Sequence, residues 1–316
     1  PLAAAREELG IWGMSVEAAR NFRDKARMKD VLREAIVPCA RHALVGTAGA
    51  ARQFVETVGF PVIAKPPAGA GGKGTVRLDN GSDFAQHLAT SPPDPSAPTL
   101  LEEFVRGAEH SFDSVFVNGE MVWHSISRYL PSPLEVLENP WIQWAVVLPR
   151  EISGPEWTPI RDAAERGIRA LGLQTGLSHM EWFRLQQNRI AISEVGARPP
   201  GAQITSLLSY AHDLDFYRAW SRLMVRGEFP CPARRWAVGA AYFRGQGEGR
   251  VRRITGLDEA QRRFGPLVVE AKLPVEGQSP SGSYEGEGYV IVRHEDTAVV
   301  ERAVHDIISL VRVELA

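Results

Sequence analysis

The chain has 316 residues, 44% of them hydrophobic and 23% charged, and a formal net charge of −2. This length suits two or three subdomains, and the balanced charge argues against a nucleic-acid-binding or membrane-surface protein. No apolar run is long enough to span a bilayer, and the first residues lack the apolar core of a signal peptide. Cys39 and Cys231 have neither disulfide nor metal-site spacing, which favours a reducing cytoplasm and no catalytic role for either thiol.

The first 35 residues are predicted to be mostly helical. We expect a short helix within Pro1–Arg20, a glycine-containing break, and a second helix capped by Ser15. Helix then continues through Asn21–Ala35, where apolar residues recur with a period of 3.6. Taken alone, Lys25 and Lys29 lie one turn apart on this helix and are expected on a solvated face.

A glycine-rich loop follows a buried-type strand. We predict a strand at Arg41–Val45, a helix at Ala48–Val58 and a strand at Pro61–Lys65. The loop Pro66–Gly74 follows, and then a strand at Thr75–Leu78.

This loop has several interpretations. The spacing of a P-loop fails, and Gly69, Gly71 and Gly74 fit the dinucleotide fingerprint, but that fingerprint must open a helix and a strand follows here. A third interpretation is a flap whose backbone N–H groups surround phosphates, with charge from Lys65 and Lys73. We favour this phosphate-binding flap over a merely flexible hairpin tip.

The central part of the chain alternates between strands and helices. We expect a helix at Ser82–Ala89, a proline-rich connector at Ser91–Pro98 and a strand at Thr99–Val105. A hairpin that turns at Asn118-Gly119 follows at His110–Ser127. A strand at Trp141–Leu148 and an amphipathic helix at Glu156–Ala170 complete this part. We expect Tyr129–Pro140 to be irregular, and the neighbouring aromatic residues up to Trp144 either line an apolar pocket or pack as a loop.

The most informative stretch is a second predicted hairpin. Two strand-forming runs, Leu177–Leu185 and Arg189–Val195, flank a short polar break that suits a turn. The register set by this turn places Glu181 opposite Glu194 on one face. Two facing carboxylates repel unless a cation lies between them, so the pair indicates either a site for a divalent cation such as Mg²⁺ or an ordinary hairpin with solvated glutamates. Arg198 follows, held near the same carboxylates by a rigid Pro-Pro-Gly turn.

The last third of the chain contains no further chemical motif. We expect helices at Gln203–Ala211 and Asp213–Val225, and then short strands and one helix at Trp236–Phe243, Leu267–Lys272, Gly288–Val292 and Asp296–Val311. Residues 227–316 are interpreted as a separate small α+β subdomain.

In this order the motifs resemble the ATP-grasp superfamily, in particular its carboxylate–amine ligases similar to biotin carboxylase and the L-amino-acid ligases. The motifs are Arg23-Asp24-Lys25 with Met28-Lys29, Pro61–Lys65 before the glycine loop, Leu101–Val105 with Gly107 and Glu109, His179 with Glu181, and Ser193–Gly201. The resemblance implies an α+β fold that holds ATP between two α+β subdomains, a lid at residues 21–104 and a catalytic core at 105–226. Residues 1–20 are expected to be the tail of an N-terminal domain that similar enzymes carry.

The resemblance also implies roles for individual residues. Lys25 and Lys65 would hold the ATP phosphates, and the glycine loop with Gly71, Gly72, Lys73 and Gly74 would close over them. Glu103, Phe104 and Val105, next to Glu102 of the same nucleotide site, would contact adenine, and Glu109 would contact the ribose. Glu181 and Glu194 match the pair that binds Mg²⁺, or alternatively Mn²⁺. Arg198 matches the arginine that faces the transferred phosphoryl group.

Three positions lack an assured family role. Gly196 stands where the family often has an asparagine that also binds the metal, so water or substrate must supply that ligand. His179 is either a base or substrate ligand, or a packed histidine. Lys29 keeps its expected place on a solvated helix face.

The implied activity is ATP-dependent formation of an amide bond between a small carboxylate and an amine, with amino acids as expected substrates and a homodimer as an expected assembly. An acyl phosphate would be the intermediate, and ADP and phosphate the products. One alternative is a bicarbonate- or formate-activating enzyme of the same fold. Another is an ATP-binding domain without turnover.

Overall fold

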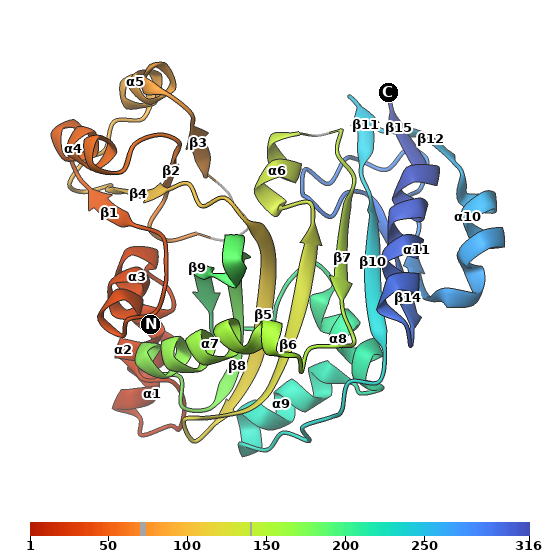
Figure 1. Ribbon diagram of the computed structural model, residues 1–316, viewed down its shortest axis with the longest axis horizontal. Coiled ribbons are helices and arrows are strands. Elements are labelled where there is room, and N and C mark those ends of the chain that lie inside the picture. The colour runs from red at the N-terminus through yellow and green to blue at the C-terminus, as the bar shows by residue number, and fades with distance from the viewer. Residues whose placement is uncertain (70–73, 140) are drawn as a thin grey trace. The chain divides into compact units, whose positions relative to one another are not determined.

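The computed structural model describes residues 1–69, 74–139 and 141–316 (Figure 1). The chain forms two compact units, each assembled from three chain segments. Unit 1 contains Pro1–Gly107, Phe116–Met121 and Thr158–Ala197, and unit 2 contains Ala108–Val115, Val122–Trp157 and Arg198–Ala316. The subdomain boundaries that we expected near residues 20, 104 and 226 stay predictions.

Unit 1 begins with the three helices α1 (Leu2–Glu8), α2 (Val16–Asn21) and α3 (Lys25–Glu34). The prediction of one continuous helix from residue 21 to 35 is wrong, because α2 ends and α3 starts anew. The carboxylate of Asp24 accepts hydrogen bonds from two N–H groups in the first turn of α3, at 3.0 and 3.1 Å, and so caps this helix. As a result Lys25 is the first residue of α3.

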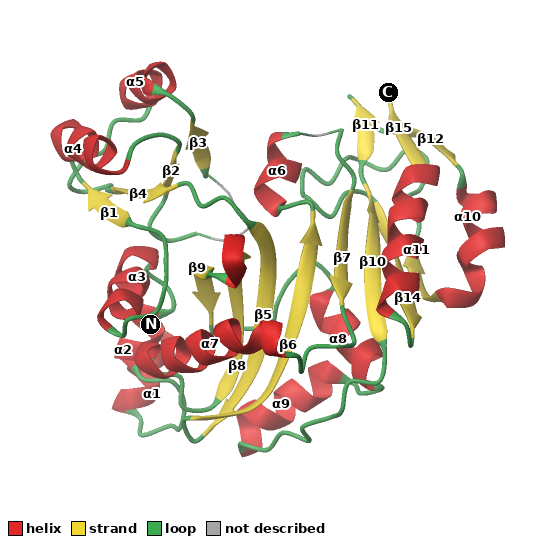
Figure 2. Cartoon of the chain, viewed as in Figure 1, coloured by secondary structure: helices red, strands yellow, loops and turns green. Residues whose placement is uncertain are grey.

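A four-stranded antiparallel sheet follows, in the order β1-β4-β2-β3. The strands and the two helices that pack on the sheet occur close to their predicted positions, as β1 (His42–Val45), α4 (Ala48–Val58), β2 (Val62–Lys65), β3 (Val76–Leu78), α5 (Gly81–Thr90) and β4 (Thr99–Glu103). Figure 2 shows α4 and α5 on the same side of this sheet. Val62, Ala64 and Leu101 point into the core under these helices, together with Val55 and Phe84. Because side chains alternate along a strand, Lys65 and Glu102 belong to the opposite face.

The second part of unit 1 is the predicted hairpin, β8 (Gly176–Arg184) and β9 (Ile190–Gly196), which follows α7 (Thr158–Leu171). Helix α3 contacts both α7 and β9. A side chain at Gly167 of α7 would place its Cβ 2.9 Å from a methyl group of Leu32 on α3, so this glycine permits the close approach of the two helices. One turn earlier on the same face of α3, the N–H of Val195 lies 3.2 Å from the sulfur of Met28.

Unit 2 is organised around a chain of antiparallel strand pairs, β6-β7-β10-β14-β13. Its larger elements are the strands β5 (Ala108–Val117), β6 (Glu120–Leu130), β7 (Trp144–Leu148), β10 (Ala237–Phe243), β13 (Val268–Lys272) and β14 (Gly288–His294), with the helices α8 (Ile204–His212), α9 (Phe216–Arg226) and α11 (Thr297–Leu310). The end of β5 and the start of β6, within Phe116–Met121, belong to unit 1. Because β10 pairs with β7, strands from before and after residue 227 form one sheet.

Several short elements of unit 2 differ from the sequence prediction. The segment expected to be irregular contains helix α6 (Pro133–Glu138), which Ser132 caps and which has proline at its first position, where no intrahelical N–H is needed. Elements missed by the sequence analysis are β11 (Gly245–Gly247), β12 (Val251–Thr255), α10 (Leu257–Phe264) and β15 (Arg312–Leu315). In the part of the chain that the structure describes, no helix has the length and apolar character needed to cross a membrane.

Candidate active site

The two hairpin glutamates face each other. Glu181 on β8 pairs with Glu194 on β9, as the sequence predicted. Closer to the turn the prediction of the register is wrong by one residue, since Trp182 pairs with Ile192 and Ser193 is left as an extra residue, a β-bulge. Without the bulge, Glu181 would lie opposite Ser193. The bulge therefore brings the two carboxylates together.

The environment of this pair is unfavourable for two negative charges. Burial and the neighbouring charge of Glu194 raise the pKa of Glu181 above its usual range, although His179, Lys25 and Lys65 act in the opposite direction. The Glu181 and Glu194 side chains are 33% and 28% exposed, so both remain accessible to a small ligand. Carboxylate oxygens in this arrangement suit a hard divalent cation.

Lys25 provides a cation at the same place. Its ammonium group forms an ion pair with Glu194, and the lysine side chain is only 12% exposed. Because Lys25 opens α3, the cap at Asp24 fixes the position of its backbone. The expectation that both α3 lysines lie on a solvated face is wrong for Lys25, since α3 packs against β9 on this side.

The same expectation is also wrong for Lys29. Its side chain is fully buried, and its Nζ lies 3.3 Å from Oε1 of Glu102, to which Lys65 Nζ also comes within 2.9 Å. Burial lowers the pKa of Lys29, partly opposed by the charge of Glu102. The apolar neighbours Met28 and Leu32 are buried as well, so this stripe of α3 faces protein rather than water.

The segment after β4 is held by contacts within unit 1. The carboxylate of Glu103 accepts hydrogen bonds from the backbone N–H and the Nε of Arg41, at 2.8 and 2.6 Å. The N–H of Phe104 donates to the carbonyl of Pro61 at 3.1 Å, and the guanidinium of Arg77 lies 4.3 Å from the centre of the Phe104 ring. The expected adenine-binding role of Glu103, Phe104 and Val105 stays a prediction.

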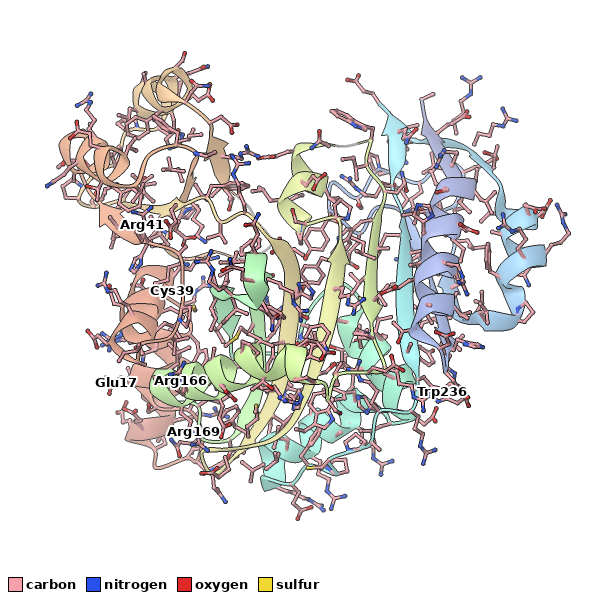
Figure 3. The ribbon with its side chains drawn as sticks, viewed as in Figure 1. Glu17, Cys39, Arg41, Arg166, Arg169 and Trp236 are labelled. Carbon is pink, nitrogen blue, oxygen red and sulfur yellow. The ribbon has the colours of Figure 1, made fainter. Side chains whose placement is uncertain are left out.

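Cys39 and Arg41 lie in the same region of unit 1 (Figure 3). The Sγ of Cys39 is 3.8 Å from the carbonyl oxygen of Lys29, and burial raises the pKa of this thiol. A thiol with a raised pKa is a poor nucleophile at neutral pH.

His179 lies two residues before Glu181 on β8, so both side chains belong to one face of the strand. Its Nε2 is 3.9 Å from Oε1 of Glu181, and the imidazole is almost fully buried. Arg198 opens the third segment of unit 2, and its Nη1 donates to the carbonyl of Pro199 at 2.9 Å. Glu109 also belongs to unit 2 and is buried. The expected places of Arg198 and Glu109 beside the unit 1 site stay predictions.

The expected phosphate-binding loop is described only at its ends. Gly71, Gly72 and Lys73 fall outside the described residues. Gly74 has a φ of +74°, a left-handed conformation that favours glycine.

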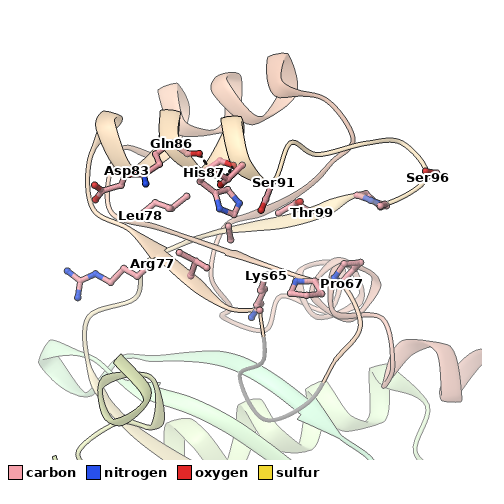
Figure 4. Close-up of a pocket in the computed structure, with 17 residues that line it drawn as sticks. Lys65, Pro67, Arg77, Leu78, Asp83, Gln86, His87, Ser91, Ser96 and Thr99 are labelled. Carbon is pink, nitrogen blue, oxygen red and sulfur yellow. Dashed lines mark hydrogen bonds between the residues drawn. The ribbon is translucent and has the colours of Figure 1, made fainter. Parts of the chain in front are cut away.

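An open cavity of about 900 Å³ lies beside this loop (Figure 4). Its lining includes Lys65, Pro67 and Gly74 near the ends of the loop, and Gln86 and His87 of α5. The sequence analysis did not predict this cavity, because its walls come from segments that are not adjacent in the sequence. Lys65 borders this cavity, and its side chain is 9% exposed.

The described residues contain no cluster of three or more histidine, cysteine, aspartate or glutamate side chains suited to a metal ion. A cation bound by Glu181 and Glu194 would therefore take its other ligands from water or substrate. Mg²⁺ is usually held in this way, by one or two carboxylates with phosphate oxygens and waters.

Comparison with known sequences finds a matching family model and several relatives. Residues 24–112 match the family described as "Carbamoyl-phosphate synthase L chain, ATP binding domain". The chain is 25% identical over 309 residues to an uncharacterized protein of Sinorhizobium fredii, covering 93% of this chain and 62% of that protein. It is 21% identical over 284 residues to the L-arginine-specific L-amino acid ligase of Bacillus subtilis, covering 84% and 65% respectively. The chain thus spans less than two thirds of the length of these relatives.

Solved structures extend the likeness to nearly the whole chain. The L-amino acid ligase from Bacillus licheniformis superposes with a TM-score of 0.80 at 18% identity, covering 99% of this chain and 77% of the other. The phosphoribosylglycinamide synthetase from Anaerococcus prevotii gives a TM-score of 0.69 at 17% identity, with coverages of 100% and 79%. At such identities the likeness concerns the fold.

Proposed function

The chain belongs to the ATP-grasp superfamily and has its α+β fold, and from this premise we propose that it is an ATP-dependent carboxylate–amine ligase. A carboxylate oxygen of the first substrate attacks the γ-phosphorus of ATP, and the bond to the leaving ADP breaks. The nitrogen of the second substrate then attacks the acyl carbon of the acyl phosphate. A C–N bond forms, the C–O bond to phosphate breaks, and the amine releases its proton.

The observation that carries this proposal is the pairing of Glu181 with Glu194 beside Lys25. Phosphoryl transfer requires positioning and neutralisation of charge more than covalent chemistry. Mg²⁺ or Mn²⁺ held by the two carboxylates would neutralise charge on the phosphates. Lys25 and Lys65 supply two further positive charges within the same unit.

His179 and Arg198 complete the proposed machinery. The buried imidazole, close to Glu181, is suited to accept a proton from the amine or to bind a substrate. Arg198 would stabilise the negative oxygen of the tetrahedral intermediate, and the loss of such a donor typically lowers the rate by about 10²–10³.

Amino acids are the substrate class that we propose, because one relative is named as an L-amino acid ligase. The proposal includes a cytoplasmic protein that acts on small molecules as a homodimer. Dimerisation is checked by light scattering during size-exclusion chromatography, where a monomer mass contradicts it.

The nucleotide product is the test of the reaction. Purified protein is incubated with Mg-ATP and pooled amino acids, and ADP, AMP, phosphate and new amides are measured by chromatography and mass spectrometry. We expect ADP and phosphate in amounts that match the amide, and their loss in Glu194→Gln. Glu228→Gln, which changes an exposed glutamate of unit 2, is the matched control.

Other products would contradict the ligase. AMP formation excludes the acyl-phosphate route. Formation of ADP that depends on bicarbonate or formate, but on no amino acid, identifies the alternative small-carboxylate chemistry. Nucleotide binding without turnover over the full substrate panel identifies a binding domain.

A further inference from the structure

A buried cluster of charged side chains is formed by Lys29, Glu102 and Lys65. The proposed reaction uses Lys65 but gives no role to the other two. They come from α3, β4 and β2, and their side chains are 0%, 6% and 9% exposed. Both lysine ammonium groups lie close to one oxygen, Oε1 of Glu102, at 3.3 Å for Lys29 and 2.9 Å for Lys65.

The charges of this cluster do not cancel. With both lysines protonated, two ammonium groups and one carboxylate give a net charge of +1; the charge of Glu102 favours the protonated form of Lys29, although burial lowers its pKa. The two lysines hold the pKa of Glu102 below its usual range even though burial opposes this, so the carboxylate is ionised at neutral pH. A Glu102–Lys65 pair without Lys29 would have no net charge.

The two lysines differ in what they can reach. Lys65 lines the open cavity beside the glycine loop, whereas Lys29 has no exposed surface and cannot contact a ligand there. Complete burial of a lysine is costly and rare, and a methionine or leucine would fill this position of α3 without that cost. Any effect of Lys29 on a ligand in the cavity is therefore indirect, and Glu102 is its ion-pair partner.

We propose that Lys29 and Glu102 are positioning residues for nucleotide binding: Glu102 fixes the ammonium group of Lys65, and Lys29 keeps the cluster positively charged. Lys65 can then attract phosphate although it contacts a carboxylate. The inference rests on the nucleotide site of the proposed function and deepens it.

The test measures the Kd of Mg-ADP by isothermal titration calorimetry, which requires no amide formation. Lys29→Met keeps the volume and leaves Glu102 neutralised by Lys65, so we expect a folded protein. The cluster loses its net charge, and we expect the Kd to rise on the order of 10-fold, as for a lost charge-assisted contact. Lys272→Met, at an exposed lysine of β13 in unit 2, is the matched control and should leave the Kd unchanged.

The double variant Lys29→Met/Glu102→Gln separates charge from packing. It removes one positive and one negative charge, while the amide oxygen of the glutamine can still accept a hydrogen bond from Lys65 and hold it in place. Lys65 therefore keeps its position and its full charge, and we expect the Kd to return to within about threefold of the wild-type value. A purely structural role predicts instead that two core substitutions weaken binding further. Thermal unfolding of each variant shows whether it is folded.

Each outcome supports or overturns the inference. An unchanged Kd in Lys29→Met, or a double variant that binds no better than the single one, overturns it while the proposed function stands. A wild-type protein that binds no nucleotide overturns both.

Discussion

Replacing Glu181 by glutamine should stabilise the ligand-free protein while it removes the proposed cation site. The amide keeps the size of the side chain but removes one of the two facing charges. At a Cβ separation of about 5 Å, two full charges repel by about 3 kcal/mol at an effective dielectric constant of about 20. Both side chains are partly exposed and Lys25 already pairs with Glu194, so we expect about 1 kcal/mol of this to remain.

The gain should depend on pH. The pKa of Glu181 is raised in the folded protein, so its carboxyl is protonated in both the folded and unfolded states below the ordinary glutamate value of about 4.3. Below that pH, Glu181 carries no charge and does not destabilise the folded protein. As the pH rises from that value through the raised one, the folded state loses its advantage in proton binding. The stabilisation by Glu181→Gln should therefore be full at pH 7.5 and vanish near pH 4.

Differential scanning calorimetry at these two pH values measures the effect. We expect the Tm of Glu181→Gln to exceed that of the wild type by about 2 °C at pH 7.5. Added Mg²⁺ should raise the Tm of the wild type and not that of the variant, because ligand binding stabilises only a protein that has the site. Glu228→Gln should respond like the wild type. An equal or lower Tm for Glu181→Gln at pH 7.5 would refute the reasoning.

Three further substitutions test other parts of the structure. Gly167→Ala should lower the free energy of unfolding by about 1–3 kcal/mol, because its Cβ would lie 2.9 Å from a methyl group of Leu32. Gly81→Ala is the control and should not lower it, because a Cβ there meets nothing within 4 Å. Urea unfolding measures both variants, and equal losses of stability would contradict the predicted clash. His212 is buried with a pKa lowered to about 4, so it destabilises the folded state as the pH falls from about 6.5 towards 4. The stability lost in His212→Gln should therefore shrink between pH 7.5 and pH 5 in urea titrations, and a loss that does not change with pH would exclude this titration. Asp24→Ala should lower the free energy of unfolding by about 1 kcal/mol, because α3 loses its cap. It should also weaken the binding of Mg-ADP, because the cap positions Lys25. A Kd equal to that of the wild type would show that the cap does not determine the position of Lys25.

Elements with a clear apolar period were predictable from the sequence. Helix α4 occurs at its predicted bounds, Ala48–Val58, because inward-facing residues recur every three to four positions, as at Ala51 and Val55, and a glycine closes the helix. Helix α6 was missed because it is short and proline-rich, and only its capping serine and first-turn proline indicate a helix. The fold itself was predictable from the order of the motifs, since the ATP-grasp fold is confirmed over nearly the whole chain.

The candidate site was predictable only in part. Opposite positions for Glu181 and Glu194 followed from the turn, but the bulge at Ser193 that produces this pairing has no sequence signal. The burial of Lys29 could not be read from α3 alone, because a lysine normally faces water. Its partner Glu102 lies far along the chain, on the face of β4 opposite the core under α4 and α5, and only the tertiary structure brings the two together.

The division of each unit among three chain segments has a consequence for synthesis on the ribosome. Lys25 leaves the ribosome 169 residues before its partner Glu194, and the residues between them include two segments of unit 2. A nascent chain that ends at Gly107 already contains Lys29, Lys65 and Glu102 but lacks α7 and the hairpin that pack against α3. Neither unit can therefore finish folding before translation has passed residue 197, and no single uninterrupted gene fragment encodes one unit alone.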